Sequence, residues 1–119
     1  MTKKYILLKS DTIDYLDIIL YRIKRLSDGE LGGYIEHEDN LSHNGDCWIS
    51  ENAMALGNAQ VYDNAQVYDN AQICNAIVSG NARVYNNARV YNNALVTGNA
   101  QVHGDADIHG SSWALDKIQ

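Results

Sequence analysis

The chain has 119 residues, no Phe or Pro, and a net charge of −6 at neutral pH, which allows one domain with a modest core. The acidic balance argues against direct binding of nucleic acid, because phosphate contacts need Lys and Arg, although mimicry of a nucleic-acid backbone stays open. Cys47 and Cys74 are too few for a disulfide framework and predict free thiols, and the lack of a signal peptide or membrane-spanning run predicts a cytoplasmic protein.

Residues 1–34 carry no repeat, and two interpretations of this head compete. A helix would start at Ser10 or Asp11 and end at Gly29. Its apolar face would be formed by Ile13, Leu16, Leu20 and Ile23. The alternative is a pair of strands, Lys4–Leu8 and Ile18–Leu26, because the second segment is rich in β-branched and aromatic residues. Local pattern alone leaves both interpretations open.

A turn-rich segment joins the head to the rest of the chain. Residues 27–33 contain three glycines in five positions, but they lack the glycine spacing and the Lys-Ser/Thr pair of a phosphate-binding loop. Residues 34–45 follow as two degenerate six-residue units, centred on Ile35 and Leu41. A slip of two residues at Asp46–Trp48 precedes the regular pattern.

From Ile49 to about Ser112 the sequence repeats every six residues. From Val61 to Ile108 a Val or Ile recurs at each sixth place, a small residue follows four positions later, and Asn or Asp usually precedes the small residue. Extended residues alternate inward and outward, whereas Asn and Gly tolerate the left-handed backbone of a sharp corner. Three such units would close one triangular coil, and successive coils would stack as parallel strands. One unit, Ile73–Ile77, is a residue short, and we expect a corner to absorb the deletion.

This pattern resembles the hexapeptide-repeat family of left-handed parallel β-helices over roughly residues 35–112. The resemblance implies an all-β fold with about four triangular coils, and the left-handed sense is implied by the family rather than by the period. Proteins of this family are often trimers, and its acyltransferases use a histidine at a subunit boundary as general base.

A narrower resemblance rests on Leu20–Ile23, Gly29–Glu36 and Asn40–Ile49. These segments look like those of short bacteriophage and prophage proteins in which a strand pair precedes such repeats. The resemblance implies a phage origin and favours strands in the head. We therefore expect an N-terminal capping β-hairpin at 1–34, a β-helix at 35–112 and a C-terminal tail at 113–119.

Taking every third unit sorts the coil residues onto three walls. Wall one is centred on Ile49, Val67, Val84 and Val102, wall two on Ala55, Ile73, Val90 and Ile108, and wall three on Val61, Val78, Val96 and Ala114. On wall three the outward residues include a candidate apolar patch for a partner or for oligomerisation, formed by Tyr62, Ile77, Leu95, Trp113 and Leu115. On wall one a second candidate contact surface consists of Tyr68, Arg83, Tyr85 and His103.

The sequence indicates no catalytic set, metal site or cofactor. His103 and His109 fall on adjacent walls and point apart, and no Ser-His-Asp or Cys-His arrangement is recognisable. We therefore expect a non-catalytic protein-binding module that inhibits a host protein by occupying its surface, an anti-defence role of the anti-CRISPR type being the most concrete form. The alternatives are a homo-oligomeric scaffold and a small acyltransferase-like enzyme with His103 or His109 at a subunit boundary.

Overall fold

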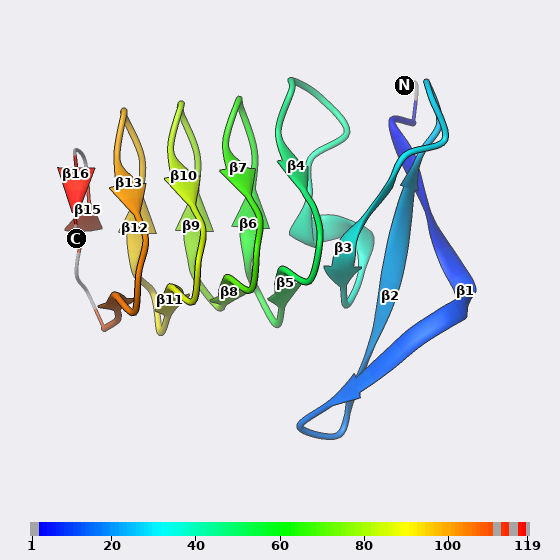
Figure 1. Cartoon of the computed structure of the whole chain (residues 1–119), viewed down its shortest axis with the longest axis horizontal. Helices are drawn as coiled ribbons and strands as arrows, with labels where there is room; N and C mark the ends of the chain where they lie inside the picture. Colours follow the sequence, from blue (N-terminus) through cyan, green and yellow to red (C-terminus); the bar gives the residue numbers. More distant parts are fainter. Residues whose placement is uncertain (1–2, 111–112, 115–116, 119) are drawn as a thin grey trace.

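The computed structural model describes residues 3–110, 113–114 and 117–118, the last four by their backbone alone. Parallel coils form a solenoid with an antiparallel hairpin at its N-terminal end (Figure 1). The hairpin and its connection comprise β1 (Tyr5–Tyr15), β2 (Ile18–Arg25), β3 (Leu31–Ile35) and the 3-10 helix η1 (Glu38–Asn40). The solenoid strands are β4 (Trp48–Ile49), β5 (Met54–Leu56), β6 (Gln60–Val61), β7 (Gln66–Val67), β8 (Gln72–Cys74), β9 (Ile77–Val78), β10 (Arg83–Val84), β11 (Arg89–Tyr91), β12 (Leu95–Val96), β13 (Gln101–Val102), β14 (Asp107–Ile108), β15 (Trp113–Ala114) and β16 (Lys117–Ile118).

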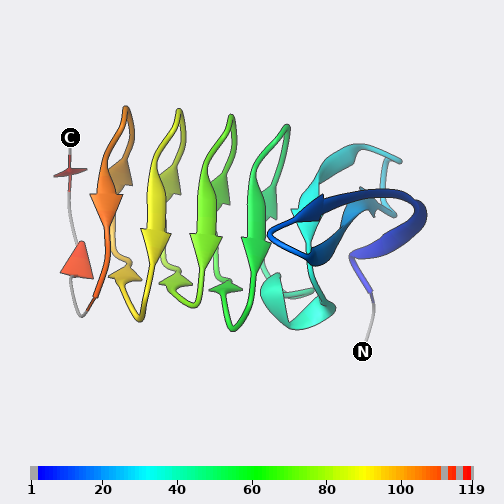
Figure 2. The ribbon, with the colours of Figure 1, turned by 90° about the horizontal axis from the view of Figure 1, so that it is seen from below.

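The three walls have the predicted composition. Wall one is the sheet β16-β13-β10-β7-β4, wall three is β15-β12-β9-β6, and wall two is β5-β8-β11-β14 extended by β3, β2 and β1. The chain rises through β6, passes over the top to β7 in front and returns through β8 below, which makes the solenoid left-handed (Figures 1 and 2). The all-β, left-handed parallel β-helix with an N-terminal hairpin is therefore confirmed.

Inward Val and Ala columns form the core. Val84 lies between Val67 and Val102 in register, and all three are completely buried. The alanines that follow each corner, from Ala65 to Ala100, are at most 1% exposed. The two-residue corners are closed by a hydrogen bond from the alanine N–H to a carbonyl three residues earlier, as from Ala88 to Tyr85 at 3.3 Å.

The corners show why Asn, Asp and Gly recur there. The first corner residue has positive φ, for example 59° at Asp63 and 65° at Gly80, a region that these residue types tolerate. The second corner residues form side-chain amide ladders along the solenoid. One ladder runs through Asn52, Asn70, Asn87 and Asp105, and another through Asn64, Asn81 and Asn99.

The corner at Asn75 absorbs the missing residue, as the sequence predicted. This corner has one residue before its alanine, Asn75, with a φ of 55°. The strands on either side keep the register of their neighbours. Its side-chain Oδ1 accepts a hydrogen bond from the Asn58 N–H at 2.8 Å. The side chain thus replaces a backbone acceptor that a full-length corner would supply.

The head consists of strands, and the helix alternative for residues 10–29 is wrong. β1 pairs antiparallel with β2, with a register shift between Leu8 and Thr12. β2 pairs with β3, and β3 runs parallel to β5, so the hairpin continues the sheet of wall two. The helical interpretation failed because these non-local pairings decide the conformation of a segment whose local pattern fits both states.

Candidate interaction surfaces

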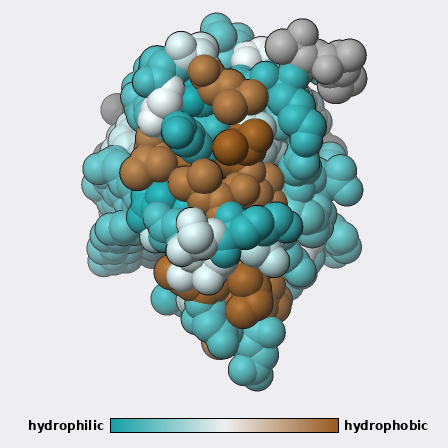
Figure 3. All heavy atoms as spheres, turned by 90° about the vertical axis from the view of Figure 1, so that its right-hand side faces the viewer, coloured by the Kyte–Doolittle hydropathy of each residue, from teal (hydrophilic) through white to brown (hydrophobic). Residues whose placement is uncertain are grey.

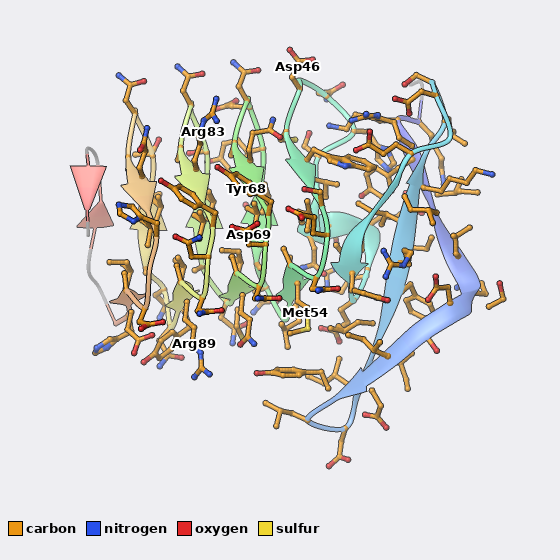
Figure 4. All side chains as sticks on the ribbon, viewed as in Figure 1. Asp46, Met54, Tyr68, Asp69, Arg83 and Arg89 are labelled. Carbon is orange, nitrogen blue, oxygen red and sulfur yellow. The ribbon has the colours of Figure 1, made fainter. Side chains whose placement is uncertain are left out.

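Wall one carries the predicted aromatic ladder on its outer face. The rings of Tyr68 and Tyr85 stack with centroids 5.0 Å apart, and those of Tyr85 and His103 with centroids 5.2 Å apart. Arg83 lies in register with Gln66 and is exposed (Figure 4). Asp46 and Arg83 line the same open groove, and Arg83 forms no ion pair within the described part of the chain.

The outer face of wall two is partly covered by the hairpin. Leu20, Met54 and Leu56 form a small buried cluster, on which Ile13, Tyr15 and Ile18 pack. The Tyr15 hydroxyl donates a hydrogen bond of 2.9 Å to Oε1 of Gln72, and Figure 2 shows the hairpin reaching over this wall. The hairpin therefore gains a second, separate core. Sequence reasoning missed this core, although Met54 and Leu56, the outward residues of the first coil of wall two, are both apolar and could have indicated it.

Beyond the part covered by the hairpin, the outer face of wall two carries a stacked pair of aromatic rings. The ring of Tyr91 lies on that of His109 with centroids 5.3 Å apart. Arg89 points away from the same wall (Figure 4). Since His103 and His109 each stack on a tyrosine of the preceding coil, both rings have a packing role.

The candidate patch on wall three is only partly within the described residues. Ile77 and Leu95 are neighbours in register and half-buried, and together they line a shallow groove of about 340 Å³. The Trp113 backbone pairs with Leu95, Leu115 lies outside the described residues, and Tyr62 stands at another position of the same wall. The contiguous apolar patch stays a prediction.

The large apolar side chains most exposed among the described residues all belong to the head. They are Ile6, Leu16, Ile19, Leu26 and Leu31, with exposed fractions between 39% and 77%. Ile6 and Leu31 flank Lys24 in one row across β1, β2 and β3. Figure 3, which looks onto this end of the molecule, shows apolar side chains gathered at its centre within a polar surround. Sequence reasoning missed this surface because the head has no repeat that sorts inward from outward positions.

A polar cluster fixes the start of β1 to the loop after η1. His43 stacks on Tyr5 at 4.2 Å, accepts the Lys4 N–H at Nδ1 (3.0 Å) and donates from Nε2 to Glu38 (2.8 Å). The hydrogen bond from His43, supported by Lys3, lowers the pKa of Glu38. Burial raises the pKa of Tyr5, whose hydroxyl donates to the Leu41 carbonyl at 2.6 Å. The cluster therefore has a clear structural task.

The two thiols are expected to differ in reactivity. Burial raises the pKa of both Cys47 and Cys74, so the reactive thiolate is scarce at neutral pH and increases as the pH rises. Cys47 is 1% exposed whereas Cys74 is half-buried. A thiol reagent at pH 8 should therefore label Cys74 in the native protein and Cys47 only on unfolding. The variant Cys74→Ser should lose the native labelling, and fast labelling of Cys47 would contradict the expectation.

Within the part of the chain that the structure describes, no three His, Cys, Asp or Glu side chains gather so that they could hold a metal ion. None of the helices in the same residues has the length and apolarity needed to cross a bilayer.

Comparison with known proteins identifies the repeat. The family model described as the YdcK beta solenoid repeat matches residues 59–75, 76–90 and 88–104. These residues correspond to the coils from β6 to β13. A comparison with curated proteins gives no match. The stacked coils and the repeat match together define this chain as a repeat β-solenoid protein.

Proposed function

We propose that this chain is a non-catalytic protein-binding module that acts by occupying a surface on a partner protein. The observation that carries the proposal is the concentration of exposed apolar side chains on the head. Monomeric proteins seldom leave large apolar patches in water, and such patches mark interaction sites. The solenoid supplies a rigid, repeat-built support for that surface.

The partner that we propose is a host protein in the bacterial cytoplasm. The resemblance of Leu20–Ile49 to phage and prophage proteins, within a hexapeptide-repeat β-helix, supports a phage origin. Inhibition of host defence, of the anti-CRISPR type, is the concrete form of the proposal. The net charge of −6 supports a protein partner rather than nucleic acid.

The wall-one ladder is the second contact surface that we propose. It has stacked tyrosines and Arg83, residue types favoured at binding hot spots. Stacking between coils stabilises the solenoid as well, so the two roles need separate measurements. Tyr85→Ala is expected to lower the free energy of unfolding by about 1 kcal/mol, whereas Arg83→Ala should leave stability within about 0.5 kcal/mol. A loss of partner affinity in Arg83→Ala therefore reports contact rather than folding.

The test begins with the full chain as bait in an extract of the bacterial host. A protein that it retains is purified, and its affinity for the chain is measured by calorimetry. Ile19→Asp in the head should weaken that affinity at least about tenfold, while Leu95→Asp on wall three should leave it within about twofold.

Light scattering on the same samples distinguishes the alternatives. A stable oligomer dispersed by Leu95→Asp, without any partner, would support a scaffold, and measurable acetyl-CoA binding would support an acyltransferase.

A further inference from the structure

The tip of the β1–β2 hairpin presents an apolar side chain to solvent. Leu16 is 77% exposed, more than Ile6, Ile19, Leu26 or Leu31. The helical interpretation of the head placed this residue on a buried face. In the structure it projects from the turn that joins two strands.

Leu16 also has an unfavourable backbone conformation. Tyr15 pairs with Ile18, so Leu16 and Asp17 form a two-residue turn, and their φ values are 53° and 66°. Positive φ at both positions is typical of a type I′ turn, which strongly favours Asn-Gly. A bulky residue at positive φ is uncommon, and such outliers concentrate at functional sites. Folding alone would favour Asn at position 16.

Contacts with wall two hold the tip of the hairpin in place. Tyr15, next to Leu16, donates its hydroxyl hydrogen bond to Gln72 on wall two. Ile13 and Ile18 pack on the cluster that contains Leu56. A side chain presented from a fixed turn loses little conformational freedom on binding.

Two acidic residues, Asp14 and Asp17, flank Leu16 in the sequence, and Arg89 of wall two lines the same open pocket as Leu16. Asp14 and Asp17 are both exposed, and neither forms an ion pair with any residue that the structure describes. An apolar side chain flanked by exposed carboxylates complements an apolar pocket that has Lys or Arg at its edge. The same carboxylates would be repelled by the anionic surface of a membrane.

We propose that Leu16 is the anchor that inserts into an apolar pocket of the partner protein, and that Asp14 and Asp17 contact basic residues at the edge of that pocket. This inference rests on the proposed function and adds the contact residue and the chemistry of the partner. It accounts for the exposure, the strained backbone and the unpaired charges of one turn. A surface anchor buried on binding is the common form of an interaction hot spot.

The first experiment locates the contact. Benzoylphenylalanine is placed at position 16 of the full chain, and the control is the same substitution at position 105, an exposed corner of the solenoid outside the proposed contact surfaces. The chain is then cross-linked in bacterial host cells. We expect a cross-link from position 16 to a second protein, at a peptide that contains Lys or Arg. A cross-link only to another copy of this chain, or to a peptide without basic residues, would overturn the partner chemistry.

The second experiment measures the purified partner against matched variants. Leu16→Asn is expected to weaken binding at least about tenfold, and to raise the melting temperature by about 2–5 °C because Asn fits the turn. Asp17→Asn should weaken binding less and make it less sensitive to salt. The control Leu95→Asn makes the same chemical change on wall three and should keep the affinity within about twofold.

The outcomes separate the anchor from the proposed function. If the partner binds Leu16→Asn as tightly as the wild type, the anchor is wrong and the protein-binding function stands. If Leu16→Asn melts lower than the wild type, Leu16 is a structural residue and the inference fails. If the wild-type chain binds no host protein at all, the proposed function and the anchor both fail.

Discussion

Val84→Asp is expected to leave the chain unfolded at room temperature. Val84 is completely buried between Val67 and Val102, so the new carboxylate would have apolar neighbours above and below. An unpaired buried charge costs about 4–5 kcal/mol or more, which approaches the whole stability of a small domain. Circular dichroism during thermal and urea denaturation measures the effect.

Arg83→Asp is the matched control for this variant. Arg83 precedes Val84 on β10, but its side chain is exposed. The same acidic residue should therefore change the free energy of unfolding by only about 0.5 kcal/mol. Equal losses in the two variants would contradict the alternation of inward and outward side chains on which the wall assignment depends.

Gly33→Val is expected to separate the head from the solenoid. A Cβ at position 33 would lie 2.4 Å from the Ala53 carbonyl oxygen and 2.8 Å from Cγ2 of Ile49. Backbone cannot move aside cheaply, so β3 would lose its pairing with β5, at a cost of about 3 kcal/mol. Hydrogen exchange should show fast exchange of the β1–β3 amides while those of β7 to β13 stay protected.

Gly104→Ala controls for the loss of glycine flexibility. A Cβ at Gly104 would meet nothing within 4 Å, although its φ is 64°. The expected cost is about 1–2 kcal/mol from the backbone alone, without loss of β3 pairing. If the head of Gly33→Val stayed as protected as that of Gly104→Ala, the steric account of this junction would be wrong.

The solenoid could be predicted from sequence because its period fixes its geometry. Once three units make one coil, the position of a residue in the repeat determines both its wall and its direction. The pairing of Arg83 with Gln66 and Gln101 and the stack of Tyr85 on Tyr68 follow from counting. The short unit at Asn75 did not disturb this, since the corner absorbed it.

The head could not be predicted in the same detail. Its strands depend on pairing between segments far apart, and its bulge after Leu8 shifts the alternation of β1. The sequence therefore did not show that the hairpin covers wall two, or that Ile6 and Leu31 lie exposed beside Lys24. The conformation of Leu16 was unpredictable too, because Leu is disfavoured in the turn that it occupies.

Hydrogen–deuterium exchange of the full chain, alone and bound to the host protein proposed as its partner, tests the protein-binding account most directly. We expect the largest protection on binding in the peptide that spans Asp14–Ile19, because this turn would become buried in the partner. The wall-three peptide around Leu95 should exchange as in the free chain. Protection confined to the solenoid walls, with the hairpin tip unchanged, would contradict the account.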